Sequence, residues 1–90
     1  GVFAIVLECL PSRLARDITR AVKVPTIGIG AGKFCDGQIL VIHDMLGLYS
    51  DLSPKFAKRY AELGRQMRKA FASYKLEVEN GAFPDEDHSY

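Results

Sequence analysis

The chain has 90 residues, of which 48% are hydrophobic and 26% charged, with a formal net charge of +1. This size allows one modest core, and the balanced charge gives no electrostatic argument for nucleic acid or a membrane surface as partner. The two cysteines, Cys9 and Cys35, show no CxxC or metal-ligand spacing, which favours buried free thiols, a reducing compartment and a cytoplasmic location.

The first segment is an unbroken apolar run, Val2–Leu7, followed by Glu8 and then Pro11. A run without alternation predicts a strand buried on both faces, as in a parallel sheet. It is too short to cross a bilayer, and it lacks the basic start and cleavage site of a signal peptide. Because the chain begins directly on this strand without an initiator Met, we expect it to be a piece of a longer protein.

A helix and two further strands are predicted next. Ser12 has the character of an N-cap, and apolar side chains at helical spacing continue to Val22. A short strand, Thr26–Ile29, runs into a glycine-rich corner at residues 30–32. A third apolar run, Gln38–Ile42, is rich in β-branched residues and predicts a third strand.

The second half of the chain predicts helices. Ser53 and Pro54 are a strong helix start, and Gly64 indicates a break before a second helix at about residues 65–80. Gly81 suits the C-cap of that helix, and residues 82–90 predict a polar, loosely held tail.

This order of elements predicts the α/β class with a parallel sheet. Three strands and a few helices are too few to cover both faces of such a sheet, and its outer strands would be open edges. We therefore expect residues 1–90 to be an incomplete part of a single domain. Its other strands would come from the rest of the same protein or from another chain.

Glu8 is the main candidate for a catalytic residue. It stands at the carboxyl end of a strand predicted to be buried, where parallel α/β enzymes place their catalytic groups. A partly buried carboxylate there is suited to act as a general base or acid. The alternative is a strand-end carboxylate that caps the next helix or pairs with a basic neighbour, and position alone does not separate the two.

Other segments carry weaker signals. The glycine corner lacks the GxGxxG spacing and the Lys-Ser/Thr pair of nucleotide loops, so it indicates a tight turn or a close approach by substrate. His43 and Asp44 end the third predicted strand without a third ligand or nucleophile, which favours a structural role. Residues 85–88 suit a solvated tail better than a metal site. Three apolar residues of the second and third strands belong either to the core or to an apolar substrate pocket: Ile29, Ile39 and Val41.

Four segments, in order, resemble the ketopantoate hydroxymethyltransferase family. They are residues 7–11 (LECLP), 25–32 (PTIGIGAG), 36–44 (DGQILVIHD) and 54–58 (PKFAK). The ending from Glu77 to Ser89 matches as well, so the resemblance spans nearly the whole chain.

The resemblance implies a fold and an activity. The family forms a TIM (β/α)8 barrel of the phosphoenolpyruvate/pyruvate type, in which this chain would be the C-terminal part with the sixth to eighth strands. The family transfers a hydroxymethyl group from 5,10-methylenetetrahydrofolate to 2-oxoisovalerate, giving ketopantoate on the route to pantothenate and coenzyme A. It uses Mg²⁺ and forms large homo-oligomers, typically decamers.

Four positions carry the family's functional residues over to this chain. Glu8 matches the proton acceptor, which takes the proton from the carbon beside the keto group, and Ile29, Ile39 and Val41 match pocket positions. The family's Mg²⁺ ligands and its lysine and serine contacts to the keto acid lie in earlier strands. No residue here is therefore assigned to the metal, and we expect the 90-residue chain alone to be inactive.

Two other functions stay open. One is another keto-acid enzyme of the same barrel superfamily, such as a lyase or decarboxylase. The other is a non-catalytic assembly piece, whose closing helices pack against neighbouring subunits. Its aromatic anchors would be Phe56, Tyr60, Phe71 and Tyr74.

Overall fold

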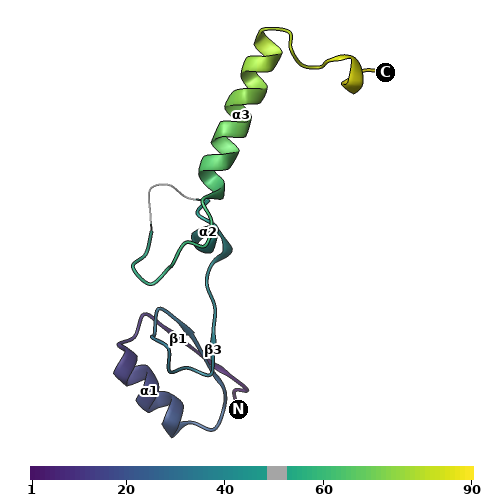
Figure 1. Cartoon of the computed structure of the whole chain (residues 1–90). Helices are drawn as coiled ribbons and strands as arrows, with labels where there is room; N and C mark the ends of the chain where they lie inside the picture. The colour runs from purple at the N-terminus through teal and green to yellow at the C-terminus, as the bar shows by residue number, and fades with distance from the viewer. Residues whose placement is uncertain (49–52) are drawn as a thin grey trace.

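The computed structural model describes residues 1–48 and 53–90 and shows an extended α/β chain (Figure 1). The elements are β1 (Ile5–Glu8), α1 (Ser12–Ala21), β2 (Thr26–Ile29), β3 (Gly37–Gln38), α2 (Ile42–Met45), α3 (Leu63–Glu79) and the 3-10 helix η1 (Glu86–His88). The Cα radius of gyration is 21.4 Å, whereas a compact domain of this length has about 12 Å. The difference arises because α3 stands out from the sheet.

The three strands form one parallel sheet in the order β1-β2-β3. Residues 5–8 of β1 pair in register with residues 26–29 of β2, and the two residues of β3 pair with Ile27 and Gly28. The helix α1 connects β1 to β2. The predicted α/β class with a parallel sheet is confirmed.

The helix α1 covers one face of the sheet, and no described element covers the other. Leu7, Ala15 and Ala31 form the buried core between β1, α1 and the loop after β2. Because successive side chains of a strand point to opposite faces, Val6 and Glu8 lie on the face away from α1. Val6 is 56% exposed. The predicted burial of β1 on both faces is therefore wrong within this chain.

The first two elements begin at different residues from those predicted. β1 starts at Ile5, whose N–H donates to the Pro25 carbonyl at 2.9 Å. Val2 and Phe3 precede it and are exposed, because β2 offers no residues opposite them. Ser12 is the first residue of α1 rather than its N-cap, and it makes no side-chain capping bond.

The third strand is shorter than predicted, and His43 and Asp44 do not lie at its end. After β3 the N–H of Ile39 still donates to a β2 carbonyl, but α2 begins at Ile42. The N–H groups of Asp44 and Met45 donate to the Val41 carbonyl and close the first turn of α2. The carbonyls of Val41 and Ile42, which a longer strand would offer to a neighbouring strand, accept hydrogen bonds within this helix instead.

In the described part of the segment before α3, no helix begins at Ser53, contrary to the prediction. The Pro54 carbonyl accepts a hydrogen bond from Ala57 in a single turn. Farther along, the N–H of Tyr60 donates to the Met45 carbonyl at 2.8 Å. This bond ties the segment to α2, so the helical spacing of its apolar residues does not produce a helix.

Gly64 joins α3 to the end of α2 instead of separating two helices. It is buried in the first turn of α3, and its N–H donates to the Gly47 carbonyl at 3.1 Å. A Cβ at Gly64 would lie 2.7 Å from the Gly47 oxygen and 3.0 Å from that of Leu48. Only glycine allows this close approach of the two backbones.

The helix α3 ends as predicted at a glycine. Gly81 has φ +76, its N–H donates to the Val78 carbonyl, and the N–H of Ala82 donates to the Glu77 carbonyl. This pair of bonds is the Schellman motif of helix C-termini. In the described residues no helix combines the length and the apolar character needed to cross a membrane.

Candidate functional site

The candidate site lies at the carboxyl ends of β1 and β2, on the face of the sheet away from α1. Glu8 is the last residue of β1 and pairs in register with Ile29, the last residue of β2. Alternation therefore places both side chains on the same open face. Glu8 is exposed rather than partly buried as expected. A carboxylate beside an apolar side chain suits proton abstraction from an apolar carbon acid.

The chain turns sharply after Glu8. Cys9 has φ +52, in the left-handed region that residues other than glycine rarely adopt. Its N–H donates to the Ile29 carbonyl at 2.9 Å, which ties the turn to β2 and fixes the position of Glu8. The thiols of Cys9 and Cys35 are free, as predicted. The predicted burial of Cys9 is wrong, because the residue lies in this turn beyond the core and is exposed.

The glycine corner is a packed turn. Gly30 and Gly32 have φ of +65 and +78. A Cβ on Gly30 would lie 2.8 Å from the Phe56 ring, and one on Gly32 would lie 2.5 Å from the Ser12 hydroxyl. The amide of Gln38 donates to the Gly32 carbonyl at 2.8 Å. Because protein atoms fill the space beside both glycines, the corner matches the predicted tight turn and not a phosphate loop.

A cleft of about 860 Å³ lies over this end of the sheet. It is lined by the loops after β1 and β2, by residues 38–40 and by residues between 55 and 60. Ile39 is among the lining residues, whereas Ile29 lies on the open sheet face and Val41 is the exposed N-cap of α2. Glu8 is joined to the cleft by Cys9, its neighbour in the chain.

Sequence reasoning missed three lysines in this cleft: Lys33, Lys55 and Lys58. All three are exposed and lie in loops, so their sequence positions gave no sign that they share a cleft. They come together because Phe56 packs over Gly30 and brings the segment that carries two of the lysines to the glycine corner. The described residues that line the cleft include no Asp or Glu.

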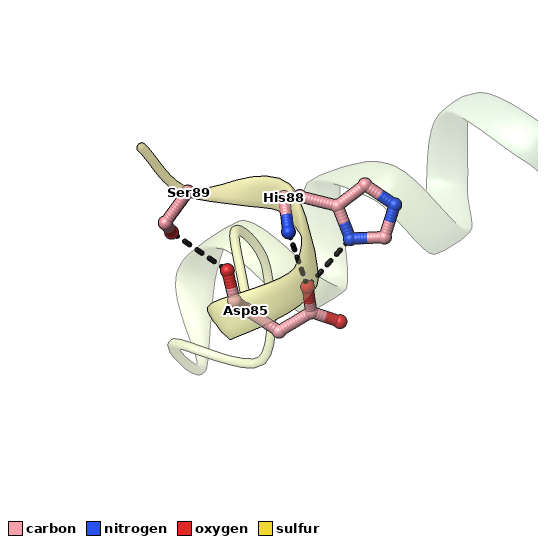
Figure 2. Close-up of polar contacts among 3 residues, drawn as sticks. All are labelled: Asp85, His88 and Ser89. Atoms are coloured by element: carbon pink, nitrogen blue, oxygen red, sulfur yellow. Dashed lines mark hydrogen bonds and ion pairs between the residues drawn. The ribbon is translucent and has the colours of Figure 1, made fainter.

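The other polar residues considered from the sequence lie elsewhere. His43 and Asp44 belong to α2 and are not among the described residues of the cleft. In the C-terminal tail, the carboxylate of Asp85 accepts a hydrogen bond from the His88 N–H at 3.1 Å and contacts ring atom Nδ1 at 2.5 Å (Figure 2). The Ser89 hydroxyl donates to the Asp85 carbonyl and not to the imidazole, so these three residues form a capped turn and no nucleophile relay.

The described residues do not fit a Mg²⁺ site. In the described ranges no three His, Cys, Asp or Glu side chains gather where a metal ion could bind. Mg²⁺ requires several oxygen ligands in near-octahedral geometry. Glu8 is the one Asp or Glu within the described strands β1, β2 and β3, and its neighbour on β2 is the apolar Ile29.

Residues 1–86 match a family model described as ketopantoate hydroxymethyltransferase. The whole chain aligns with curated proteins named 3-methyl-2-oxobutanoate hydroxymethyltransferase. It is 61% identical to that of Clostridium acetobutylicum, 60% to that of Clostridium kluyveri and 57% to that of Enterococcus faecalis. These matches cover 100% of this chain and 33%, 32% and 33% of the relatives. The chain thus spans about a third of the length of the curated relatives it matches.

Proposed function

Because the chain belongs to the ketopantoate hydroxymethyltransferase family, we propose that it forms the last part of an enzyme that makes ketopantoate from 3-methyl-2-oxobutanoate. The observation that carries the proposal is the pairing of Glu8 with Ile29 at the carboxyl end of a parallel sheet. The names of the relatives favour hydroxymethyl transfer over the lyase or decarboxylase alternative.

In the proposed complete enzyme, β1, β2 and β3 are the sixth to eighth strands of a TIM barrel. The open face of the sheet is then the inner face of the barrel, and α1 lies on the outside. Barrel enzymes carry their active sites at the carboxyl ends of the strands. The parallel strand order, with a helix on one face only, supports this placement.

Glu8 is the proposed general base. Its carboxylate takes the proton from the carbon beside the keto group, and the C–H electron pair moves into an enolate. Water hydrolyses the methylene bridge of 5,10-methylenetetrahydrofolate, so that both C–N bonds break, tetrahydrofolate leaves and the carbon is released as formaldehyde. The enolate carbon attacks this carbonyl carbon to form the new C–C bond, and the resulting alkoxide takes a proton to become the hydroxyl group. Ile29 and Ile39 would pack against the isopropyl group of the keto acid, and Val41 remains a further pocket candidate.

The remaining parts of the proposal concern groups outside this chain. We propose that the complete enzyme uses Mg²⁺. Its ligands would come from earlier strands of the enzyme, because the described residues of this chain offer no fitting set. We also propose a cytoplasmic homo-oligomer, a decamer as in the family, acting in pantothenate synthesis. The exposed aromatic residues of α3, Phe71 and Tyr74, support assembly.

The test is a transfer assay on the complete enzyme, meaning the longer protein that contains residues 1–90. With 3-methyl-2-oxobutanoate present, mass spectrometry should detect ketopantoate only when the folate donor is added. Loss of carbon from the keto acid without the donor would instead identify a lyase or decarboxylase. The 90-residue chain alone should form no product.

A further inference from the structure

Among the residues that the structure describes, no carboxylate balances the positive charge of the cleft at the rim of the sheet. None of Lys33, Lys55 and Lys58 forms an ion pair with an Asp or Glu of residues 1–48 and 53–90. The cleft's described lining residues also include no carboxylate. Three cations around one concave surface focus a positive potential on it, which favours a ligand that carries several negative charges.

The same cleft has an apolar lining that suits a flat ring. Leu10, Phe56 and Tyr60 are among its lining residues. Lys58 Nζ lies 5.0 Å from the centroid of the Tyr60 ring, so cation and aromatic surface are adjacent. The volume, about 860 Å³, lies within the range of clefts that bind ligands of drug size. The lining therefore fits a ligand with an aromatic part and an anionic part.

The lysine cleft and the Glu8 face are adjacent but distinct. Glu8 and Ile29 lie on the open face of the sheet, and Cys9, the next residue in the chain, lines the cleft. A small keto acid has one carboxylate and needs no more than the Glu8 face. A ligand bound in the cleft would lie next to the end of β1 that carries Glu8. A second substrate, which reacts with the keto acid, has to bind in such a neighbouring position.

We propose that Lys33, Lys55 and Lys58 bind the glutamate tail of the folate donor, with its aminobenzoyl ring against Phe56 and Tyr60. This inference rests on the proposed function. The tail brings one carboxylate for each added γ-linked glutamate and one more at its end. The donor's one-carbon unit then faces the strand end that carries Glu8.

The test measures equilibrium binding to the complete enzyme, without the keto acid, of tetrahydrofolate with one or with five glutamates. The wild-type enzyme should bind the longer tail more tightly, and added salt should reduce this preference. Replacing all three lysines by Gln should raise the Kd for the longer tail roughly tenfold and abolish the preference. A matched triple variant, with Lys23, Lys69 and Lys75 changed to Gln, should bind within about twofold of wild type.

Several results would overturn the assignment. One is equal affinity of the wild-type enzyme for both tail lengths, and another is an unchanged Kd in the triple variant. A third is displacement of the five-glutamate ligand by inorganic phosphate at concentrations as low as those at which the tail itself competes. That result would identify the cleft as a general anion site. If the triple variant does not fold, the three single Lys→Gln variants test the assignment instead. Each should raise the Kd for the longer tail about twofold.

Proton exchange on the keto acid separates this inference from the proposed function. The triple variant should retain exchange of the proton beside the keto group when no donor is present. Tail binding without any exchange in the wild-type enzyme would refute the role of Glu8 and leave the lysine assignment standing. Proton exchange in a wild-type enzyme that binds both tail lengths equally would support the role of Glu8 and refute the lysine assignment.

Discussion

The sheet region, residues 1–38, leaves one face uncovered, and the helix α3 exposes an apolar stripe, but these two surfaces differ in chemistry. On the sheet, a carboxylate stands beside an apolar residue at the end of two paired strands. On α3, the open face is formed by Met67, Phe71, Tyr74 and Val78, which helical spacing places on one side. Phe71 is 63% and Tyr74 60% exposed. The first face suits a small reacting molecule, and the second suits a protein partner.

The two regions also differ in how they are held. In the sheet region, backbone ladders, a small core and packed glycines fix every element. Beyond its first turn, the side chains of α3 are exposed as far as Glu79. Substitutions in the sheet region should therefore destabilise the protein, whereas those on the outer part of α3 should act on assembly.

The largest loss of stability is expected for Gly32→Ala. The new Cβ would be strained at φ +78 and would meet the Ser12 hydroxyl at 2.5 Å. The left-handed backbone and the overpacking together should cost roughly 3 kcal/mol. Chemical denaturation of the complete enzyme measures this. Gly81→Ala is the control, because Gly81 shares the positive φ but no atom approaches its Cβ position.

A smaller loss is expected for Asp36→Ala. Thr26 is fully buried, and its N–H and hydroxyl both donate to Oδ2 of Asp36, at 2.8 and 3.2 Å. Removing the carboxylate leaves a buried N–H without a partner, at a cost of about 2 kcal/mol. Asp17→Ala, on the exposed side of α1, should change stability by less than about 0.5 kcal/mol. Equal stability of both variants would contradict the role given to the Thr26–Asp36 bonds.

The smallest effect on unfolding is expected for Phe71→Ser combined with Tyr74→Ser. Both side chains are exposed, but the Tyr74 ring also makes an edge contact with Phe83, with 5.8 Å between the ring centroids. The change in subunit stability should therefore stay within about 0.5 kcal/mol for Phe71→Ser and about 1 kcal/mol for Tyr74→Ser. The oligomer, measured by analytical ultracentrifugation of the complete enzyme, should instead dissociate to smaller species. Lys69→Ser on the opposite side of α3 is the control. An unchanged oligomer in the double variant would exclude this face as an interface.

The elements of the sheet region could be predicted because their signals are local. The unbroken apolar run Val2–Leu7, the short strand pattern at Thr26–Ile29 and the helical spacing after Ser12 suffice for β1, β2 and α1. The helix predicted at Ser53 was wrong because a tertiary bond, from Tyr60 to Met45, takes a backbone donor that a helix would need. A single sequence does not specify that bond.

The site was predictable in part for a similar reason. Glu8 follows directly from its place after a strand, and the parallel register then puts it beside Ile29. The lysine cleft was missed because Lys33 and Lys55 are far apart in the sequence. They share a cleft only through the contact of Phe56 with Gly30.

The measurement that tests the central claim most directly is deuterium exchange at the carbon beside the keto group of 3-methyl-2-oxobutanoate. It is followed by NMR in the complete enzyme without the folate donor. Wild-type enzyme should exchange this proton, and Glu8→Gln should slow the exchange by a factor of about 10²–10⁴, the usual contribution of a general base. Glu77→Gln, an exposed carboxylate on α3, should exchange as wild type does. Exchange at the wild-type rate in Glu8→Gln would contradict the account.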